Sequence, residues 1–446
     1  MTTKLTRRAA LKAAAGALAA PAVFRSFARA APSETLLHVS VGAGGMAGSD
    51  ILSLTAGKHL KLVAVADVDE TAFDRLRAAL KKANRPTDFQ TFRDWREMFD
   101  KVKFDSANIS CPDHMHACPT MRAIQMGKAV YTQKPLTQTI HECRQLTVAA
   151  KEKKVVSQMG IQIHSAAKHK TLVALIHAGA IGKVTAVHSW SGKDWGDAGK
   201  LPDRKDEVPK TLDWDLWLGV AKDRPFLGGG YFHPGNWRKR LDFGTGTFGD
   251  MGCHILDPVF GALGVGNPSS IMSVGDAPNA TNWGLNCQVE FVFPGTKHTA
   301  DTVSLTWYNG NKRPPAEVTK LIEPHKLSGQ GSIFIGTEGV MYSNYDGGNV
   351  PILLPDEKFK TYDMPKVSGD NHYLQFVDAA RGEGKTSAPF DYAGPLTELV
   401  LLGCLATRFP KKKLEWDTKT MTVTNLEEAN QFVKRAPRKG WEEKGL

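Results

Sequence analysis

A glycine-rich segment between an apolar run and a helical pattern constrains the fold of this 446-residue chain more than any other feature. Residues 42–47 fit the pattern G-x-G-x-x-A and directly follow the apolar run Leu36–Val41. In a strand–loop–helix unit, Gly42 allows a tight turn and Gly44 lets a pyrophosphate approach the backbone, while free N–H groups at the helix start bind its charge. The predicted dinucleotide-binding loop contains Gly42, Ala43, Gly44, Gly45 and Met46.

An aspartate at the end of the next apolar run indicates which dinucleotide binds. Asp67 ends the run Leu62–Ala66 and lies 23 residues after Gly44. A carboxylate at this place accepts hydrogen bonds from the adenosine ribose hydroxyls and repels a phosphate there. We therefore expect NAD as the cofactor rather than NADP, and neighbouring Asp69 could share the role. The alternative is a glycine turn in an unrelated strand-to-helix unit with an incidental aspartate.

The order of apolar runs predicts two domains of different architecture. Short apolar runs alternate with helical stretches up to residue 160, which is typical of a doubly wound parallel sheet, so residues 34–160 are predicted to form a Rossmann domain. The predicted strands there include Leu36–Val41, Leu62–Ala66, Ala107–Ser110, Ala129–Thr132 and Val155–Met159. Residues 161–446 are predicted to form an α+β domain, because a Pro294-Gly295 turn joins two strand-like runs as in an antiparallel sheet.

Two local signals place helix ends within the first domain. Thr139 with Glu142 three residues later forms a capping box, and Gly127 stands where a helix C-terminal glycine belongs. Later, Asp250 and His254 are four residues apart and would share one face of a helix.

Composition and charge exclude several classes of protein. The chain has 41% hydrophobic and 23% charged residues, which is typical of a folded globular protein and not of a disordered one. The net charge is +11, but residues 1–30 carry six basic residues and no acidic one. The remaining surplus is small for so long a chain, so the sequence offers no basic patch for nucleic acid.

The first thirty residues have the parts of an export signal. Thr6-Arg7-Arg8 begins a stretch similar to the twin-arginine signal, an apolar run of about 12 residues follows, and Ala28-Arg29-Ala30 fits a cleavage site. The run is shorter than the roughly 20 residues that a membrane-spanning helix needs, so we expect no membrane anchor. We expect residues 1–30 to be a signal peptide that brings the folded protein to the twin-arginine export machinery, making it periplasmic or secreted. The alternative is a disordered basic tail.

The six cysteines form no C-x-x-C pair and no zinc-type spacing with histidine. A chain that folds in the cytosol would keep its thiols reduced, so we expect at most one disulfide and no structural metal.

Three residues stand where reacting groups would be useful. Lys134 follows the predicted strand Ala129–Thr132, so it lies at the carboxyl edge of the parallel sheet, where ligands bind in such folds. Asp250 and His254 could serve one proton pathway, because an imidazole with a pKa near neutrality can accept a hydroxyl proton while a carboxylate orients it. The alternatives are a solvated lysine, a capping aspartate and a buried histidine.

Read in order, these motifs resemble the Gfo/Idh/MocA family, the glucose-fructose oxidoreductases and inositol dehydrogenases. The resemblance rests on the G-x-G-x-x-A loop, Asp67, Cys111-Pro112-Asp113-His114-Met115-His116, Gly127 to Leu136, and Asp250 with His254. It implies a Rossmann domain followed by an α/β domain whose open, mostly antiparallel sheet often mediates homo-oligomers.

The resemblance also implies roles for particular residues. Lys134 matches the lysine of the family's E-K-P motif, while Asp250 and His254 match its D-x-x-x-H motif, and these three would be catalytic. Pro112 and His116 match the loop beside the nicotinamide. Gln133, also next to the nicotinamide, departs from the family's usual Glu. A metal site of His114, His116 and Asp250 is conceivable, but family and spacing argue against it.

The implied chemistry is hydride transfer between a secondary alcohol carbon of a sugar or cyclitol and a tightly bound NAD. Because free NAD is scarce outside the cytoplasm, one alternative is a redox-neutral glycosidase or sugar–sugar oxidoreductase that regenerates its cofactor. A second alternative is a nucleotide-bound sensor without turnover. Aromatic and hydrogen-bonding side chains suit a sugar ring. The candidate substrate-binding residues are His164, Tyr231, His233, Trp237 and Arg238.

Overall fold

The structure is a computed structural model that describes residues 34–346 and 350–446. The predicted export signal at residues 1–30 lies outside the described residues. Within them, none of the helices combines the length and apolar character needed to cross a membrane.

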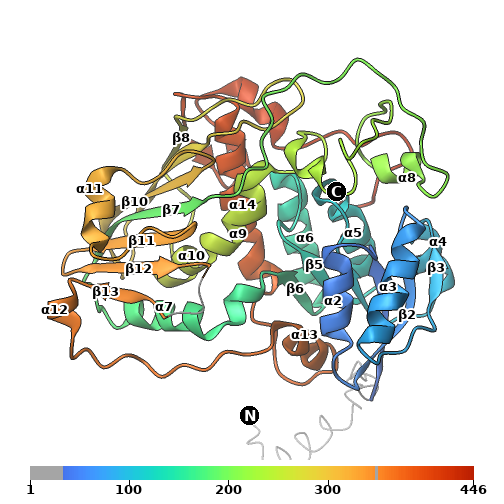
Figure 1. Cartoon of the computed structure of the whole chain (residues 1–446), viewed down its shortest axis with the longest axis horizontal. Coiled ribbons are helices and arrows are strands. Elements are labelled where there is room, and N and C mark those ends of the chain that lie inside the picture. The colour runs from blue at the N-terminus through green and yellow to red at the C-terminus, as the bar shows by residue number, and fades with distance from the viewer. Residues whose placement is uncertain (1–33, 347–349) are drawn as a thin grey trace, which may run out of the picture. The chain divides into compact units, whose positions relative to one another are not determined.

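The first domain contains the predicted parallel sheet (Figure 1). Its six strands are all parallel and lie in the order β3-β2-β1-β4-β5-β6. The strands are β1 (Leu36–Val41), β2 (Leu60–Ala66), β3 (Gln90–Phe92), β4 (Ser106–Ile109), β5 (Ala129–Gln133) and β6 (Ser157–Gly160). The helices are α2 (Met46–Leu54), α3 (Thr71–Lys82), α4 (Trp95–Lys101), α5 (Ala117–Gln125) and α6 (Ile140–Lys153). The chain order reverses at β1, because β2 and β3 follow on one side of it and β4, β5 and β6 on the other. In parallel sheets, ligands bind at the carboxyl ends of the strands at such a point.

The predicted helix ends are confirmed. Thr139 accepts the N–H of Glu142 at 3.3 Å, and the Glu142 carboxylate accepts the N–H of Thr139 at 3.1 Å. Gly127 has a φ of 70°, which is favourable for glycine, just after α5. Strand β3 was not predicted, because its three residues are largely exposed and form no apolar run.

The second sheet has eight strands in the order β13-β12-β11-β7-β10-β9-β8-β14. Only β7 with β10 is a parallel pair, so the prediction of a mostly antiparallel sheet is confirmed. The strands are β7 (Val184–Ser191), β8 (Ser270–Ser273), β9 (Gln288–Pro294), β10 (Thr299–Asn309), β11 (Gln330–Gly336), β12 (Val340–Asn344), β13 (Ile352–Leu354) and β14 (Lys413–Leu414). A separate hairpin pairs β15 (Trp416–Asp417) with β16 (Thr422–Val423).

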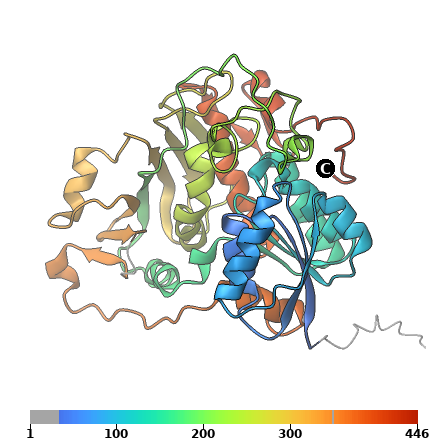
Figure 2. The ribbon, with the colours of Figure 1, turned by 45° about the vertical axis from the view of Figure 1, so that its right-hand side comes forward.

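Helices connect the two sheets, as Figure 2 shows. The α-helices after residue 160 are α7 (Ala167–His177), α8 (Trp214–Leu218), α9 (Gly246–Ile255), α10 (Asp257–Leu263), α11 (Ala316–Thr319), α12 (Asp356–Phe359), α13 (His372–Ala380) and α14 (Phe390–Thr407). Short 3-10 turns include η2 (Gln162–Ser165) and η3 (Asn236–Lys239). Helix α14 packs against both α6 and α9, so one hydrophobic core extends through both domains.

Part of the C-terminal region returns to the first domain. Phe376 and Val377 of α13 share a buried cluster with Leu36, Leu54 and Leu60, which come from β1, α2 and the start of β2. The first domain is thus completed by residues more than 300 positions after it begins, a contact that periodicity cannot reveal.

The long segment 192–245 crosses back over the first domain. The N–H of Glu70 donates to Thr211 at 2.9 Å, and the N–H of Asp213 donates to Val68 at 2.9 Å. Most of the aromatic residues in the segment pack on one another, with Phe232 and Phe243 fully buried at the centre. This packing holds the segment against the carboxyl end of β2.

The six cysteines are free thiols, and five of them are buried.

Candidate active site

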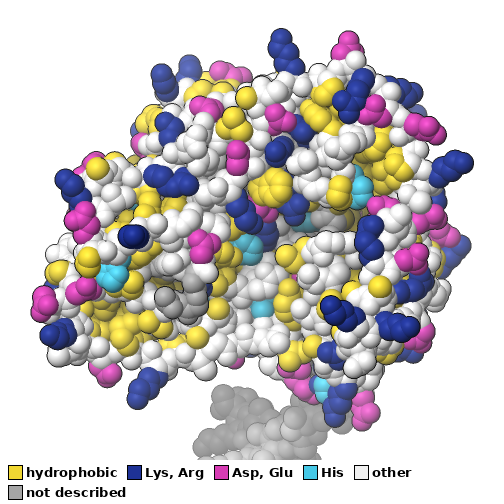
Figure 3. All heavy atoms as spheres, viewed as in Figure 1, with side chains coloured by type: hydrophobic (Ala, Val, Ile, Leu, Met, Phe, Trp, Pro, Cys, Tyr) yellow, Lys and Arg dark blue, Asp and Glu magenta, His cyan; other side chains and the backbone are white. Residues whose placement is uncertain are grey.

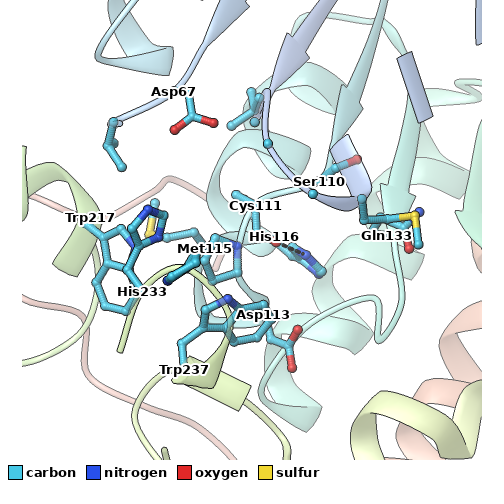
Figure 4. A pocket seen from close by; sticks show the side chains of 18 of the residues that line it. Asp67, Ser110, Cys111, Asp113, Met115, His116, Gln133, Trp217, His233 and Trp237 are labelled. Carbon is cyan, nitrogen blue, oxygen red and sulfur yellow. Dashed lines mark hydrogen bonds between the residues drawn. The ribbon is translucent and has the colours of Figure 1, made fainter. Parts of the chain in front are cut away.

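A cavity of about 490 Å³ lies between the carboxyl ends of the parallel strands and the crossing segment 192–245. Figure 3 shows lysine, arginine and histidine side chains gathered at the hollow in the middle of this face. In Figure 4, Asp67 and Gln133 lie toward different ends of the cavity, with Cys111 and His116 between them. The cavity is therefore elongated along the sheet edge.

The glycine loop forms one wall of the cavity. Gly42 has a φ of 105°, and a Cβ there would come within 2.9 Å of the Ser110 carbonyl oxygen, so the position requires glycine. Helix α2 begins after Gly45 without a side-chain cap. Gly44, Gly45 and Met46, which lead into the first turn of α2, line the cavity, and a helix start of this kind fits the pyrophosphate of a dinucleotide.

The carboxylate of Asp67 lies at the end of β2, as predicted. It accepts the N–H of Ala43 at 2.8 Å and the N–H of Asp69 at 2.9 Å, and burial raises its pKa. It lines the cavity next to the glycine loop, where an adenosine ribose would lie. Asp69 is engaged otherwise, because its carboxylate accepts the Thr71 hydroxyl at 2.7 Å and contacts His233 Nε2 at 3.0 Å.

Lys134, Asp250 and His254 come together at the other end. Lys134 follows β5, and its ammonium group donates to Asp250 Oδ1 at 2.7 Å and to the Asp250 main-chain oxygen at 2.6 Å. Asp250 and His254 project from α9, and His254 lines the same cavity. Burial, with the nearby charge of Lys134, lowers the pKa of His254 to about 3, so its imidazole is neutral at pH 7. Its Nδ1 atom is buried without a hydrogen-bond partner.

Asp250 is the centre of a wider charged group. Trp195 Nε1 donates to Oδ2 at 2.9 Å, Arg238 Nε donates to Oδ1 at 3.3 Å, and Lys193 Nζ lies 3.6 Å from Oδ2. Burial by itself would raise the pKa of Asp250, but the three cations Lys134, Arg238 and Lys193 hold it well below its usual range. Asp250 is therefore a permanent carboxylate that orders the cations around it.

Gln133 bonds to a buried aspartate that sequence reasoning did not identify. Gln133 Nε2 donates to Asp50 Oδ2 at 2.8 Å and to Oδ1 at 3.0 Å. Asp50 also accepts the hydroxyls of Ser110 at 2.7 Å and Tyr373 at 3.0 Å. Burial nevertheless raises the pKa of Asp50 to about 6. An amide at position 133 can donate to the Asp50 carboxylate on α2, whereas the Glu that is usual in the family would place a second carboxylate there.

The predicted site residues divide into two groups. Most line the cavity: Gly42, Gly44, Gly45, Met46, Asp67, Pro112, His116, Gln133, Lys134, His233, Trp237, Arg238, Asp250 and His254. Ala43 contributes its N–H to Asp67 instead. His164 and Tyr231 do not line it, because His164 Nδ1 bonds to Asp257 at 2.9 Å and the Tyr231 ring lies 3.7 Å from the Arg240 guanidinium carbon.

Lys193 and Trp195 were missed by the sequence reasoning. Both follow the end of β7, which belongs to the mostly antiparallel sheet, so the strand-end rule for parallel sheets gave no signal for them.

The histidines considered for a metal bind main-chain oxygens instead. His116 contacts the carbonyl oxygens of Pro135 and Cys111, each at 2.8 Å, and His114 Nε2 contacts that of Trp217 at 3.1 Å. Among residues 34–346 and 350–446, the group with metal-like spacing is His164, His169 and Asp257, whose ligand atoms lie within 4.8 Å of one another.

Comparisons with known proteins agree with this architecture. Residues 37–161 match the Gfo/Idh/MocA oxidoreductase family's NAD-binding Rossmann fold, and residues 165–287 match its C-terminal alpha/beta domain. Levoglucosan dehydrogenase of Pseudarthrobacter phenanthrenivorans is 23% identical over 164 residues, which are 37% of this chain and 34% of that protein. The 1,5-anhydro-D-fructose reductase of Ensifer adhaerens is 34% identical over 134 residues, 30% of this chain and 35% of that protein. The chain thus spans about a third of the length of the curated relatives it matches.

Solved structures share the fold over most of the chain. The levoglucosan dehydrogenase complex with NADH and levoglucosan superposes with a TM-score of 0.57 at 15% identity, covering 85% of this chain and 99% of that one. GenD2 from gentamicin A biosynthesis, solved with NAD, has a TM-score of 0.57 at 19% identity and covers 87% and 98%. The two family matches together cover more than half of the residues, and the N-terminal match is to an NAD-binding domain. This chain belongs to the Gfo/Idh/MocA family of oxidoreductases.

Proposed function

We propose that this protein transfers a hydride between a secondary alcohol carbon of a sugar or cyclitol and a tightly bound NAD. The observation that carries the proposal is the contact of Lys134 Nζ with Asp250 Oδ1 at 2.7 Å, with His254 in the same cavity. Relatives named levoglucosan dehydrogenase and inositol 2-dehydrogenase support a carbohydrate or cyclitol substrate. NADP is a poorer fit, because Asp67 would repel a ribose phosphate.

The side chains supply the proton chemistry and the orientation. NAD, when bound, supplies a hydride acceptor at C4 of its nicotinamide ring. An ammonium group has three N–H donors, and Lys134 uses two on Asp250, so the third can hold the substrate oxygen as negative charge develops. The neutral imidazole of His254 has a free lone pair that can take the hydroxyl proton, but a pKa of about 3 makes it a weaker base than the near-neutral imidazole expected from the sequence. Asp250 fixes the position of Lys134.

Replacement of the lysine tests this assignment. In Lys134→Ala, the ammonium group beside Asp250 is lost while the glycine loop and Asp67 are intact. We expect turnover to fall by about a hundredfold or more, as for loss of one electrostatic stabiliser, with NAD affinity largely retained. Lys128→Ala is the matched control, because Lys128 lies at the opposite end of the same strand, β5, where its ammonium group lies over the Phe104 ring. Unchanged turnover in Lys134→Ala would refute the catalytic assignment of Lys134. If the wild type binds NAD but turns over none of the carbohydrates, the result would favour a sensor without turnover.

A redox-neutral cycle is the second candidate. The crossing segment favours it, because His233 reaches Asp69 at 3.0 Å and Asp213 donates to Val68 at 2.9 Å, which would enclose the adenosine half of the nucleotide. A retained cofactor has to be regenerated in place. Relatives named glycosyl hydrolase family 109 proteins are consistent with such a cycle.

Product analysis separates the two candidates. Purified protein is incubated with sugars, cyclitols and glycosides plus excess NAD, and reduced nicotinamide and carbohydrate products are followed together. Accumulating NADH with a keto product supports the dehydrogenase. Altered carbohydrate without net NADH supports the redox-neutral cycle.

We further propose that residues 1–30 direct export of the folded protein by the twin-arginine route. The supporting feature is Arg7-Arg8 followed by an acid-free apolar run. The test replaces both arginines by lysine and follows the protein in cell fractions. We expect wild type outside the cytoplasm and the double-lysine variant retained inside. An equal distribution of both would contradict the proposal.

A further inference from the structure

The reacting end of the cavity carries more positive charge than the proposed hydride transfer requires. Lys134, Lys193 and Arg238 all lie within 3.6 Å of the single carboxylate of Asp250. Asp113 also lines the cavity, but burial raises its pKa and the Thr245 hydroxyl donates to it at 2.7 Å. Because His254 is neutral, the group has excess positive charge whether Asp113 is ionised or not.

Arg238 is held in place with its outer donors unused. Its Nε atom donates to Asp250, and its guanidinium carbon lies 4.3 Å from the Trp237 ring centroid and 5.4 Å from that of Trp195. Within the described part of the chain, neither terminal nitrogen of Arg238 has a hydrogen-bond acceptor. Aromatic faces restrict a guanidinium without neutralising it, so this cavity-lining side chain keeps its terminal N–H donors for a ligand.

Lys193 extends the same positive surface. Its side chain is 47% exposed and lines the cavity, and its ammonium is 3.6 Å from Asp250, which is beyond hydrogen-bonding distance. It follows β7, whereas Arg238 belongs to η3, so two separate elements bring cations to one place. Neither contributes to the direct bond between Lys134 and Asp250 on which the proposed transfer depends.

Building on the function proposed above, we propose that Lys193 and Arg238 form a subsite for an anionic group of the substrate, so that the enzyme acts on sugar acids. A carboxylate matches the paired donors of an arginine in a bidentate contact, with a lysine as a second point charge. Trp237 and Trp195 would cover the apolar face of the sugar ring beside it. A neutral sugar would leave the excess positive charge of Lys193 and Arg238, which share the single carboxylate of Asp250, without a second anion.

The test compares matched acid and neutral sugars. The wild type and the double variant Lys193→Met, Arg238→Gln are assayed with NAD and pairs such as glucuronate and glucose, or galacturonate and galactose, with a hexose 6-phosphate as a third arm. We expect the wild type to favour the acid, and the ratio of kcat/KM for acid over neutral sugar to fall about tenfold or more in the double variant. Raising the salt concentration should weaken the wild-type preference, since the subsite is partly exposed.

Two controls separate charge from general damage. Lys193→Arg keeps the charge and should keep the preference, and Lys205→Gln removes an exposed lysine of the same segment that does not line the cavity. The affinity for NAD is measured in every variant. If the double variant loses NAD affinity while the acid-to-neutral ratio stays unchanged, the cations serve the binding of the cofactor and the substrate subsite is refuted.

Binding measurements keep this outcome distinct from failure of the proposed function. NAD-loaded wild type and double variant are titrated with glucuronate and glucose by calorimetry. Acid binding that is lost in the double variant supports the subsite even when no hydride transfer is detected. Equal affinity of the wild type for acid and neutral sugar overturns the subsite while leaving the oxidoreductase intact. If the wild type prefers only the hexose 6-phosphate, the subsite binds a phosphate and not a carboxylate, and the assignment to sugar acids is wrong.

Discussion

Substitution of Gln133 by glutamate should make the stability of the protein strongly dependent on pH. The Gln133 amide now donates to both oxygens of Asp50 at 2.8 and 3.0 Å, and both side chains are buried. Gln133→Glu removes these two hydrogen bonds and places a second carboxylate about 3 Å from the first. At an effective dielectric constant near 20, two unit charges at this distance repel by roughly 5 kcal/mol. The pair would therefore share one proton through neutral pH.

The sign and size of the effect follow from proton linkage. In the wild type, the pKa of Asp50 is raised to about 6, so its contribution to stability is present at low pH and is lost as the pH rises through that value. Between about pH 5 and pH 8 this loss amounts to roughly 1.4 kcal/mol. In Gln133→Glu the folded pair keeps its proton while the unfolded chain does not, so the loss continues at about 1.4 kcal/mol per pH unit and reaches roughly 4 kcal/mol. The variant should thus lose roughly 2–3 kcal/mol more than the wild type over this range.

Urea unfolding at several pH values and constant ionic strength measures this difference. The matched control is the double variant Asp50→Asn, Gln133→Glu, which exchanges the carboxylate and the amide and leaves one charge between the same partners. We expect its pH dependence to return close to that of the wild type. Parallel stability curves for Gln133→Glu and the wild type would refute the reasoning, because they would mean that the two side chains do not interact as charges.

Three further predictions concern the cofactor and the base. Gly42→Ala should destabilise the protein by about 1–3 kcal/mol and weaken NAD binding, because the methyl group meets the Ser110 carbonyl oxygen. Urea unfolding measures the stability and titration measures the NAD affinity; if neither changes, this account is wrong. Asp67→Ser should lower affinity for NAD by about tenfold and improve NADP relative to NAD, which parallel titrations with the two cofactors test; an unchanged ratio would mean that Asp67 does not face the ribose. Because the pKa of His254 is lowered to about 3, the pH profile of kcat/KM for alcohol oxidation should show no step near pH 6.5 that belongs to His254. A step near pH 6.5 in the wild type that is missing in His254→Asn would show that the imidazole titrates near its ordinary value.

The sequence by itself determined the features that depend on neighbouring residues. The glycine loop, Asp67 at a strand end, and Asp250 with His254 on one helix are all set by spacing within a few residues or one strand–helix unit. The capping box at Thr139 and the positive φ of Gly127 are local in the same sense. Alternating apolar runs also predicted the parallel sheet, because backbone geometry imposes a repeat of two or 3.6 residues on buried positions.

The tertiary structure alone decided which distant side chains meet. Asp50 and Gln133 are 83 positions apart, and Lys134 and Asp250 are 116 apart, so their contacts depend on how whole elements pack and not on any local repeat. Resemblance to a family supplied Lys134 and Asp250, but nothing in the sequence linked them to Lys193, Trp195 or Arg238. Packing of β7, η3 and α9 brings Lys193, Trp195 and Arg238 around the carboxylate of Asp250. The positive charge that results at the cavity cannot be read from periodicity or composition.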